Sequence, residues 1–454
     1  MTKRSALLVA TLGSFLTPFM GSSITIALPS IGNEFSMDAV LLSWVPTVYL
    51  LAAAVFLIPF GRIADIYGRK KVFIYGILVY TGSSFLLGVS PSAGFLLFFR
   101  VFQGMGAAMI FGTAVAILTS VFPPSERGKV IGINVASVYT GLSLGPFLGG
   151  FLTQQMGWRS IFLFNVPLGV VVMCLIVLQL QGEWTGSPGE KVDVSGSVFY
   201  GLALAALMYG VSLLPSQTAL WFIVPGVAGM LVFIVWETHV DIPVLNMNLF
   251  RKNRVFTFSS AAALITYSAT HATAFLMSLY LQYIRGFNPQ DAGLILVCQP
   301  VVMVIFSPFA GRLSDKIEPR IVASFGILLT ATALFTFTML RDTTDILFIV
   351  ARLALLGCGL AFFSPPNTNA IMSSVDRKSY GIASAMVGTM RLSGQMVSMG
   401  VAMLVIAVYV GKVEITPEYY LLFMKSVKVI FGIFVGLCIC GIGASLVRGR
   451  VKRE

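Results

Sequence analysis

Several basic side chains lie inside otherwise apolar stretches of the sequence, where no carboxylate accompanies them. They are Arg100, His271, Arg352, Arg391, Lys425 and Lys428. Ionisable groups at such positions are costly, so they tend to face a polar interior and to handle charged groups or protons. Because histidine titrates near neutral pH, His271 is the candidate for proton uptake; a lone helical histidine is also commonly only a hydrogen-bonded residue. Arg352, Lys425 and Lys428 are interpreted as snorkelling or structural groups.

Other polar residues share helical faces with these basic groups. Tyr267 and His271 are four residues apart, and their stripe continues towards Gln282; Gln395 likewise lies one turn after Arg391. Such stripes either line a polar cavity or form hydrogen bonds with neighbouring helices, and the sequence leaves both interpretations open. The candidate residues for a cavity and for coupling are Met20, Ser22, Thr25, Tyr267, His271, Arg391 and Gln395.

The composition excludes a water-soluble protein. Of the 454 residues, 57% are hydrophobic and only 11% are charged, whereas a soluble domain carries about 25% charged residues. The mean hydropathy is +0.90, and a chain of this size has too little interior to bury so much apolar surface from water. Soluble enzymes, nucleic-acid-binding domains and disordered scaffolds are therefore excluded. The five cysteines all lie in apolar stretches and indicate neither disulfides nor a metal site.

Fourteen apolar stretches are long enough to cross a lipid bilayer as helices, which takes about 20 residues each. They begin near Ser5, Val40, Val72, Phe95, Val130, Ser160, Ser195, Leu220, Val255, Ala292, Ile321, Ile346, Gly381 and Tyr419. The pattern predicts an all-α polytopic membrane protein with 14 transmembrane helices.

The distribution of charge predicts how the chain is oriented in the membrane. If the N-terminus is cytoplasmic, 21 lysines and arginines fall in cytoplasmic segments and four in outer loops. Because cytoplasmic loops are enriched in Lys and Arg, both termini are predicted to be cytoplasmic. All 18 Asp and Glu residues fall between the spans, so no carboxylate is expected inside the bilayer.

An internal repeat divides the chain into two similar halves. The segment from Gly61 to Asp65 is matched 250 residues later by the segment from Gly311 to Asp315. The pair at Glu126 and Arg127 has a counterpart at the same offset. We therefore expect a six-helix half over residues 1–182, a linker with two inserted helices over 183–250, and a second six-helix half over 251–454.

Three short motifs have spacings that favour gating or close packing. The first is a loop motif of Gly61, Asp65, Gly68 and Arg69, with a weaker second copy at Gly311 and Asp315; the second is Arg100, Gln103 and Gly104; the third is Gly141, Gly145, Pro146, Gly149 and Gly150. Asp65 can pair with basic groups or with a helix N-terminus, and such a contact can hold the cytoplasmic side closed in one state and release it in the other. The alternative is that the loop is a static turn. The glycines let helices approach closely, and Pro146 kinks its helix.

Together these motifs resemble those of the Major Facilitator Superfamily, and specifically its fourteen-helix drug:proton antiporter branch. The loop motif resembles that family's G-x-L-a-D-r-x-G-r-k signature, the second motif its R-x-x-Q-G-x-G signature, and the third its span-5 antiporter signature. The resemblance covers nearly the whole chain. It implies a Major Facilitator fold with two pseudo-symmetric halves, alternating access around a central cavity, and proton-coupled export of small amphipathic compounds, as in multidrug efflux.

One position departs from the family's pattern. Relatives in that branch carry an aspartate in the first span, and Met20 occupies its position here. An exporter or uniporter of anionic or neutral compounds is therefore the alternative function, and a membrane-embedded enzyme or a sensor is a more distant one. No P-loop motif occurs, so ATP-driven pumping is not expected.

The expected partners are a small-molecule substrate, protons and the lipid bilayer of the cell membrane. Neither a nucleic acid, a cofactor, a metal nor a catalytic residue is expected, and the chain is expected to act as a monomer.

Overall fold

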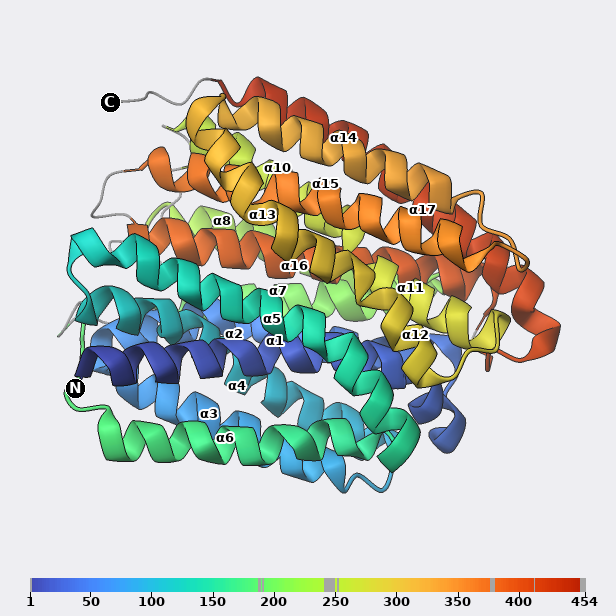
Figure 1. Ribbon diagram of the computed structural model, residues 1–454, viewed down its shortest axis with the longest axis horizontal. Helices are drawn as coiled ribbons and strands as arrows, with labels where there is room; N and C mark the ends of the chain where they lie inside the picture. Colours follow the sequence, from blue (N-terminus) through green and yellow to red (C-terminus); the bar gives the residue numbers. More distant parts are fainter. Residues whose placement is uncertain are drawn as a thin grey trace. The chain divides into compact units, whose positions relative to one another are not determined.

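The computed structural model of the protein describes residues 2–186, 189, 192–240, 250, 253–375, 380–411 and 413–449, and these contain helices and loops but no strand. Side chains are described for them except at 2, 124, 125, 127–129, 315, 380–382, 384 and 385. The helices are α1 (Thr2–Phe35), α2 (Ala39–Tyr67), α3 (Arg69–Gly88), α4 (Ala93–Val121), α5 (Pro124–Met156), α6 (Arg159–Gln179), α7 (Val194–Leu213), α8 (Leu220–Glu237), α10 (Arg254–Thr270), α11 (Ala272–Leu279), α12 (Pro289–Leu296), α13 (Cys298–Lys316), α14 (Pro319–Phe337), α15 (Ile346–Ser373), α16 (Tyr380–Tyr409) and α17 (Tyr420–Val447) (Figure 1).

In the described part of the chain, 13 helical segments are long and apolar enough to cross a membrane. The all-helical fold is confirmed, and the expected count of 14 differs by the one stretch that begins near Val255. That stretch is helical but interrupted: α10 ends at Thr270, α11 follows from Ala272, and a π-helical turn covers Tyr280–Ile284. The prediction of a single continuous helix is wrong here.

A side chain from another helix accounts for the interruption at His271. The N–H of Ala272 donates a hydrogen bond to the Ser398 hydroxyl of α16 at 3.0 Å. A side chain inserted into the backbone ladder breaks a helix at that point. The polar stripe that was expected from Tyr267 to Gln282 is therefore divided, because periodicity along one segment carries no information about a contact from a distant helix.

The described helices form two compact units. The first comprises Met1–Met37, Trp44–Leu207 and Val224–Val244, and the second comprises Asp38–Ser43, Met208–Ile223 and Leu245–Glu454. In the first unit α1 packs against α4, α5 and α6, and α3 packs against α4 and α6. In the second unit α10 packs against α15, α16 and α17, and α14 packs against α15 and α17. The same packing pattern therefore occurs in both units.

Close approaches between helix backbones recur in the two units as well. A Cβ atom added to Gly104 would lie 2.4 Å from the carbonyl oxygen of Tyr49, and one added to Gly357 would lie 2.3 Å from that of Gln299. Tyr49 and Gln299 are separated by the same 250 residues as the two loop motifs. Only glycine lets two helices approach this closely, so the repeat extends to individual packing contacts.

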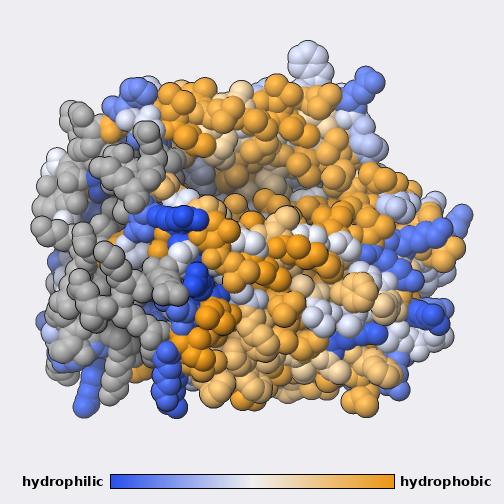
Figure 2. All heavy atoms as spheres, turned by 90° about the horizontal axis from the view of Figure 1, so that it is seen from above, coloured by the Kyte–Doolittle hydropathy of each residue, from blue (hydrophilic) through white to orange (hydrophobic). Residues whose placement is uncertain are grey.

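Exposed apolar side chains cover the outer faces of the helices. Leu178 on α6 is 77% exposed and Trp221 on α8 is 80% exposed. In Figure 2 apolar side chains dominate the middle of the visible face, and hydrophilic side chains gather towards the helix ends. A surface of this kind suits hydrocarbon and not water.

Two charged residues that the sequence places in polar segments are buried. Glu237, the last residue of α8, is 3% exposed, and Arg448, which follows α17, is fully buried. The Arg448 guanidinium donates to Asn367 Oδ1 at 2.9 Å and to Ser259 Oγ at 3.2 Å. Burial lowers the pKa of Arg448 to about 10, so it stays charged at neutral pH. The position of both residues outside the apolar spans did not indicate that burial, because it results from packing against other helices.

Candidate functional site

The glycines of the third motif lie directly against the backbone of α1. A Cβ added to Gly141 would lie 2.7 Å from the Phe15 carbonyl oxygen, and one added to Gly149 would lie 2.8 Å from the Ser23 Cα. The same addition at Gly145 would place the Cβ 2.8 Å from the Phe19 carbonyl oxygen. Three glycines spaced four residues apart therefore form one contact face, along which α5 crosses α1 at backbone distance.

Hydroxyl groups of α1 bridge this crossing. Ser23 Oγ donates to the Gly145 carbonyl at 3.0 Å, and Ser22 Oγ lies 3.4 Å from the Gly141 carbonyl. Pro146 interrupts the hydrogen-bond ladder of α5 one residue after Gly145. Small residues and side-chain hydrogen bonds thus join the two helices beside the proline that interrupts the backbone hydrogen bonds of α5.

The remaining candidates from the first span and the third motif have different surroundings. Met20 is fully buried, and Thr25 Oγ1 donates to the Gly21 carbonyl of its own helix at 3.2 Å. Gly150 is buried within α5. Of the predicted residues on α1, the structure brings Ser22 into contact with the glycine motif.

Arg100 is the centre of a buried polar network. It is fully buried; its Nε donates to the Val45 carbonyl at 3.0 Å and its Nη1 to Gln103 Oε1 at 2.6 Å. The guanidinium carbon lies 4.4 Å from the centre of the Tyr49 ring, a cation–π contact. Gln103 in turn donates to Ser84 Oγ at 2.8 Å. Arg100 therefore ties α4 to α2 and, through Gln103, to α3, and no carboxylate takes part.

The predicted loop after the second span is helical: α2 continues through Gly61 and Asp65 to Tyr67, and only Gly68 separates it from α3. An ion pair holds this α2–α3 junction. Arg69 Nη2 lies 2.6 Å from Asp65 Oδ1, and Arg69 Nη1 donates to Ser120 Oγ of α4 at 2.6 Å. Gly68 has a φ of +124°, which explains the glycine at that position. A Cβ added to Gly61 would meet nothing within 4 Å.

A segment that follows α6 is hydrogen-bonded to the α2–α3 junction, and we call this segment, residues 180–186, the strap. The N–H of Arg69 donates to the Trp184 carbonyl at 2.9 Å, and the N–H of Gly186 donates to the Asp65 carbonyl at 2.8 Å. Glu183 Oε1 accepts from the N–H of Lys70 at 2.8 Å. An acid more than 100 residues away thus caps the N-terminus of α3, where negative charge is favourable. Sequence reasoning missed Glu183, because its only signal was an acidic residue in a linker.

Loss of the strap's carboxylate is expected to loosen the first turn of α3. In Glu183→Ala the Lys70 amide loses its acceptor, which costs about 1 kcal/mol, so its hydrogen exchange should accelerate about fivefold. Exchange mass spectrometry of a peptide spanning this turn measures the effect. Glu126→Ala, which removes an exposed acid paired with Lys3 at 2.9 Å, is the control and should leave this turn unchanged. Equal exchange in both variants would show that Glu183 does not cap α3.

The second copy of the loop motif is only partly described. A Cβ on Gly311 would meet nothing within 4 Å, as at Gly61. The side chain of Asp315 lies outside the described residues, so a latch at that position stays a prediction.

The second unit has a polar face at the break between α10 and α11. We call the partly exposed side chains of Tyr267, His271, Arg391 and Gln395 the break-site face. A Cβ on Gly394 would lie 2.8 Å from Tyr267 Cβ, so α16 touches α10 here. The Tyr267 hydroxyl lies 3.1 Å from Ser364 Oγ of α15. The four predicted residues thus lie on two helices, α10 with its break and α16, that are in contact at Gly394 and Tyr267.

Ser398 stabilises the helix break between α10 and α11, and the sequence did not indicate this role. It is fully buried, and its hydroxyl accepts from the Ala272 N–H one residue after His271. Serine in an apolar helix is too common to have been singled out. Gly394, one turn earlier on α16, is a sequence signal of a close crossing at this point.

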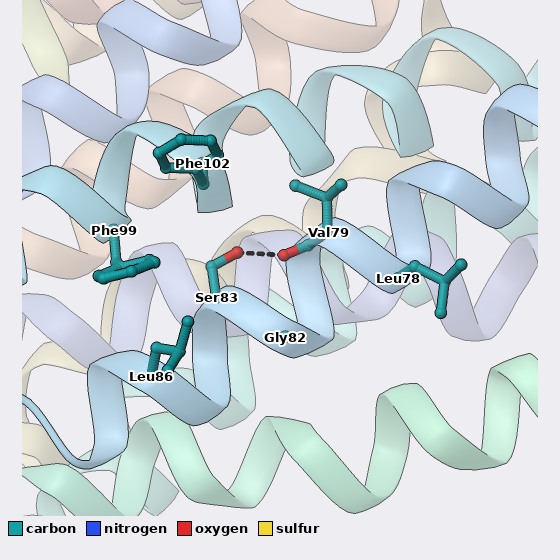
Figure 3. A pocket seen from close by; sticks show the side chains of 7 residues that line it. All are labelled: Leu78, Val79, Gly82, Ser83, Leu86, Phe99 and Phe102. Atoms are coloured by element: carbon teal, nitrogen blue, oxygen red, sulfur yellow. Dashed lines mark hydrogen bonds between the residues drawn. The ribbon is translucent and has the colours of Figure 1, made fainter.

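An apolar groove between α3 and α4 differs from these polar sites. Its lining includes Leu78, Phe99 and Phe102, and its one hydroxyl, on Ser83, donates to the Val79 carbonyl (Figure 3). Such a lining suits a lipid chain better than a polar solute. Among the described residues no group of three or more His, Cys, Asp or Glu side chains is placed to hold a metal ion.

Comparison with known proteins gives a family and several relatives. A sequence profile described as the Major Facilitator Superfamily matches residues 10–269 and 258–454. The chain is 27% identical over 388 residues to the riboflavin transporter RibZ of Clostridioides difficile, covering 85% of this chain and 84% of that one. It is 29% identical over 416 residues to the multidrug resistance protein Stp of Mycobacterium tuberculosis, covering 90% and 77%. The tetracenomycin C resistance and export protein of Streptomyces glaucescens is 27% identical over 404 residues, covering 88% and 74%.

A solved structure shares the fold. It is a bacterial homologue of the human lysosomal transporter Spinster in an inward-facing, unoccupied conformation. The TM-score is 0.68 and the sequence identity 17%, over 98% of this chain and 97% of that one.

Proposed function

Because the chain belongs to the Major Facilitator Superfamily and is a multi-pass membrane transporter, we propose that it exports small amphipathic compounds across the cell membrane by alternating access, driven by a proton gradient. The positive excess of the segments at the helix ends supports cytoplasmic termini. Residues 1–182 and 251–454 would form the two rocking halves, with residues 183–250 as the inserted pair and its linkers. The transporter would act as a monomer.

The observation that carries this proposal is the crossing of α1 by α5. Three glycines allow backbone contact, and Pro146 weakens α5 beside the same crossing. A pair of helices that closes tightly and bends at one place can shut one side of a transport path. Two relatives, a multidrug resistance protein and a tetracenomycin C resistance and export protein, favour the export of small molecules.

Reconstitution tests the proposal. The purified protein is placed in proteoliposomes with an imposed pH gradient and offered tetraphenylphosphonium as a cation, riboflavin as a neutral compound and naphthalene-2-sulfonate as an anion. Riboflavin is included because of the relative RibZ. Transport of at least one compound that rises with the gradient and stops with a protonophore is expected. If the flux of all three compounds is independent of the gradient and equals the flux into empty liposomes, the proposal is overturned.

Replacing His271 with glutamine tests its part in proton coupling. Glutamine keeps the capacity for hydrogen bonding and removes titration near neutral pH. If the proton passes through His271, the pH dependence of transport should become flat, with the folded state retained. The initial rate between about pH 5.5 and 8 measures this, and His239→Gln, at the exposed end of the inserted pair, is the matched control. A pH profile identical to the parent's would remove His271 from the coupling path.

A further inference from the structure

The apolar groove between α3 and α4, which we call the α3–α4 groove, lies on two helices that are long and apolar enough to span a membrane. Its volume is about 210 Å³. The rim is exposed and apolar: Leu78 on α3 is 51% exposed and Phe98 on α4 is 58% exposed. Because the surroundings of such a rim in a bilayer are hydrocarbon and not water, hydrocarbon must fill the groove.

The lining of the α3–α4 groove is apolar. Its one hydroxyl, on Ser83, donates to the Val79 carbonyl of the same helix. The phenyl rings of Phe99 and Phe102 on α4 form the opposite wall (Figure 3), and their centres lie 6.0 Å apart. A cavity with this lining binds by burying apolar groups and offers no partner to a charged ligand.

Gly82 gives the groove its depth. It is exposed, and a Cβ at this position would meet nothing within 4 Å. Elsewhere the same two helices touch, since a Cβ on Gly106 of α4 would lie 2.7 Å from the backbone nitrogen of Tyr80 on α3. The helices are therefore in backbone contact at one level and leave a gap beside Gly82.

The groove adjoins the buried Arg100 network. Phe99 precedes Arg100, and Ser83 precedes Ser84, which accepts the Gln103 hydrogen bond at 2.8 Å. Consecutive residues of a helix point about 100° apart. One side of the α3–α4 seam thus carries the polar network, and the neighbouring side carries the groove. An apolar chain in the groove would cover the seam and keep water away from the network.

We propose that the α3–α4 groove binds one acyl chain of a membrane phospholipid. The chain lies between the rings of Phe99 and Phe102 on one wall and Gly82 and Ser83 on the other, and the headgroup stays outside the groove. The bound chain buries apolar surface of both helices and so stabilises the seam beside Arg100. Binding of this chain does not depend on the proposed transport function.

Quenching of an added tryptophan by a brominated lipid tests the site. Phe99→Trp places the reporter in the groove wall, and the parent protein in the same detergent gives the signal of the five native tryptophans. The lipids are phosphatidylglycerol and phosphatidylcholine, each with brominated oleoyl chains. Because the groove holds only the chain, quenching should saturate at about one lipid per protein with either headgroup.

A second substitution added to Phe99→Trp separates the groove from lipid that surrounds the whole protein. Gly82→Leu fills the groove, and the loss of about two buried methylene groups of the lipid should weaken binding roughly tenfold. Gly82→Val is a smaller filler and should weaken binding less. Gly436→Leu on α17 is the matched control, because a Cβ there also meets nothing within 4 Å, and it should leave binding unchanged.

Several results would overturn the proposal. They are quenching that rises with lipid without saturating, equal binding in the Gly82→Leu and Gly436→Leu variants, and saturation with only one of the two headgroups. Light scattering of the same samples identifies a different occupant: dimers without lipid quenching would assign the groove to a second copy of the chain and would also overturn the proposal. Thermal unfolding in detergent verifies that each variant is folded.

Discussion

Replacing Gly145 with alanine is expected to lower the free energy of unfolding by about 1–3 kcal/mol and the transport rate by roughly tenfold. The added Cβ would lie 1.8 Å from Ser22 Oγ and 2.8 Å from the Phe19 carbonyl oxygen. The hydroxyl can rotate away, but the carbonyl belongs to the backbone of α1, so α1 and α5 must separate. Thermal unfolding of the purified protein and initial rates in proteoliposomes measure the two effects.

Gly132 provides a control on the same helix. A Cβ at that position would meet nothing within 4 Å. Gly132→Ala should therefore be neutral or stabilising by up to about 1 kcal/mol, since alanine is the better helix former. If Gly145→Ala behaves like Gly132→Ala in both measurements, the close crossing of α1 and α5 has no role in stability or transport.

Replacing Arg100 with alanine is expected to be the most damaging single change. It removes the donors to the Val45 carbonyl and to Gln103 Oε1 and the contact with the Tyr49 ring. Buried groups that lose their partners and the cavity left behind should together cost about 3 kcal/mol or more. We expect a markedly lower unfolding temperature and a transport rate below about a tenth of the parent's.

Two further variants separate packing from charge at Arg100. Arg100→Lys keeps the charge but cannot reach both acceptors in the fixed geometry of a guanidinium, so it should recover only part of the stability. Arg352→Ala removes the near counterpart in the second unit, whose side chain is partly exposed while that of Arg100 is fully buried, and should cost less. Equal losses in Arg100→Ala and Arg352→Ala would contradict the network described around Arg100.

The fold was largely predictable because the relevant signals are local. Length and hydropathy along each stretch are properties of one segment, and they predicted the helices that the structure contains. The prediction of one continuous helix from near Val255 failed because the decisive contact is not local. Continuous apolar sequence predicts a continuous helix, but the hydroxyl of Ser398, 126 residues beyond Ala272, ends the regular ladder.

The site was predictable to the extent that it consists of short motifs. The spacing of Gly141, Gly145 and Gly149 already indicates one helical face. The sequence did not show that α1 is the helix that packs against this face. Arg69 and Asp65 are one turn apart, so their ion pair is also a local event. Glu183 was not predictable, since an acid in a linker has no preferred partner until the chain returns to the α2–α3 junction.

The sequence by itself determined that this chain is a helical membrane protein built from two related halves, because bilayer thickness and the repeat act on residues close together in the chain. Its inventory of charges also determined that the spans of the second half hold arginine and histidine without acids. The tertiary structure decided which of these groups meet. It placed Ser398 of α16 at the break after His271 and the strap against Asp65 and Arg69 at the α2–α3 junction. Such contacts join residues more than 100 positions apart, and their geometry depends on helix packing that no local pattern specifies.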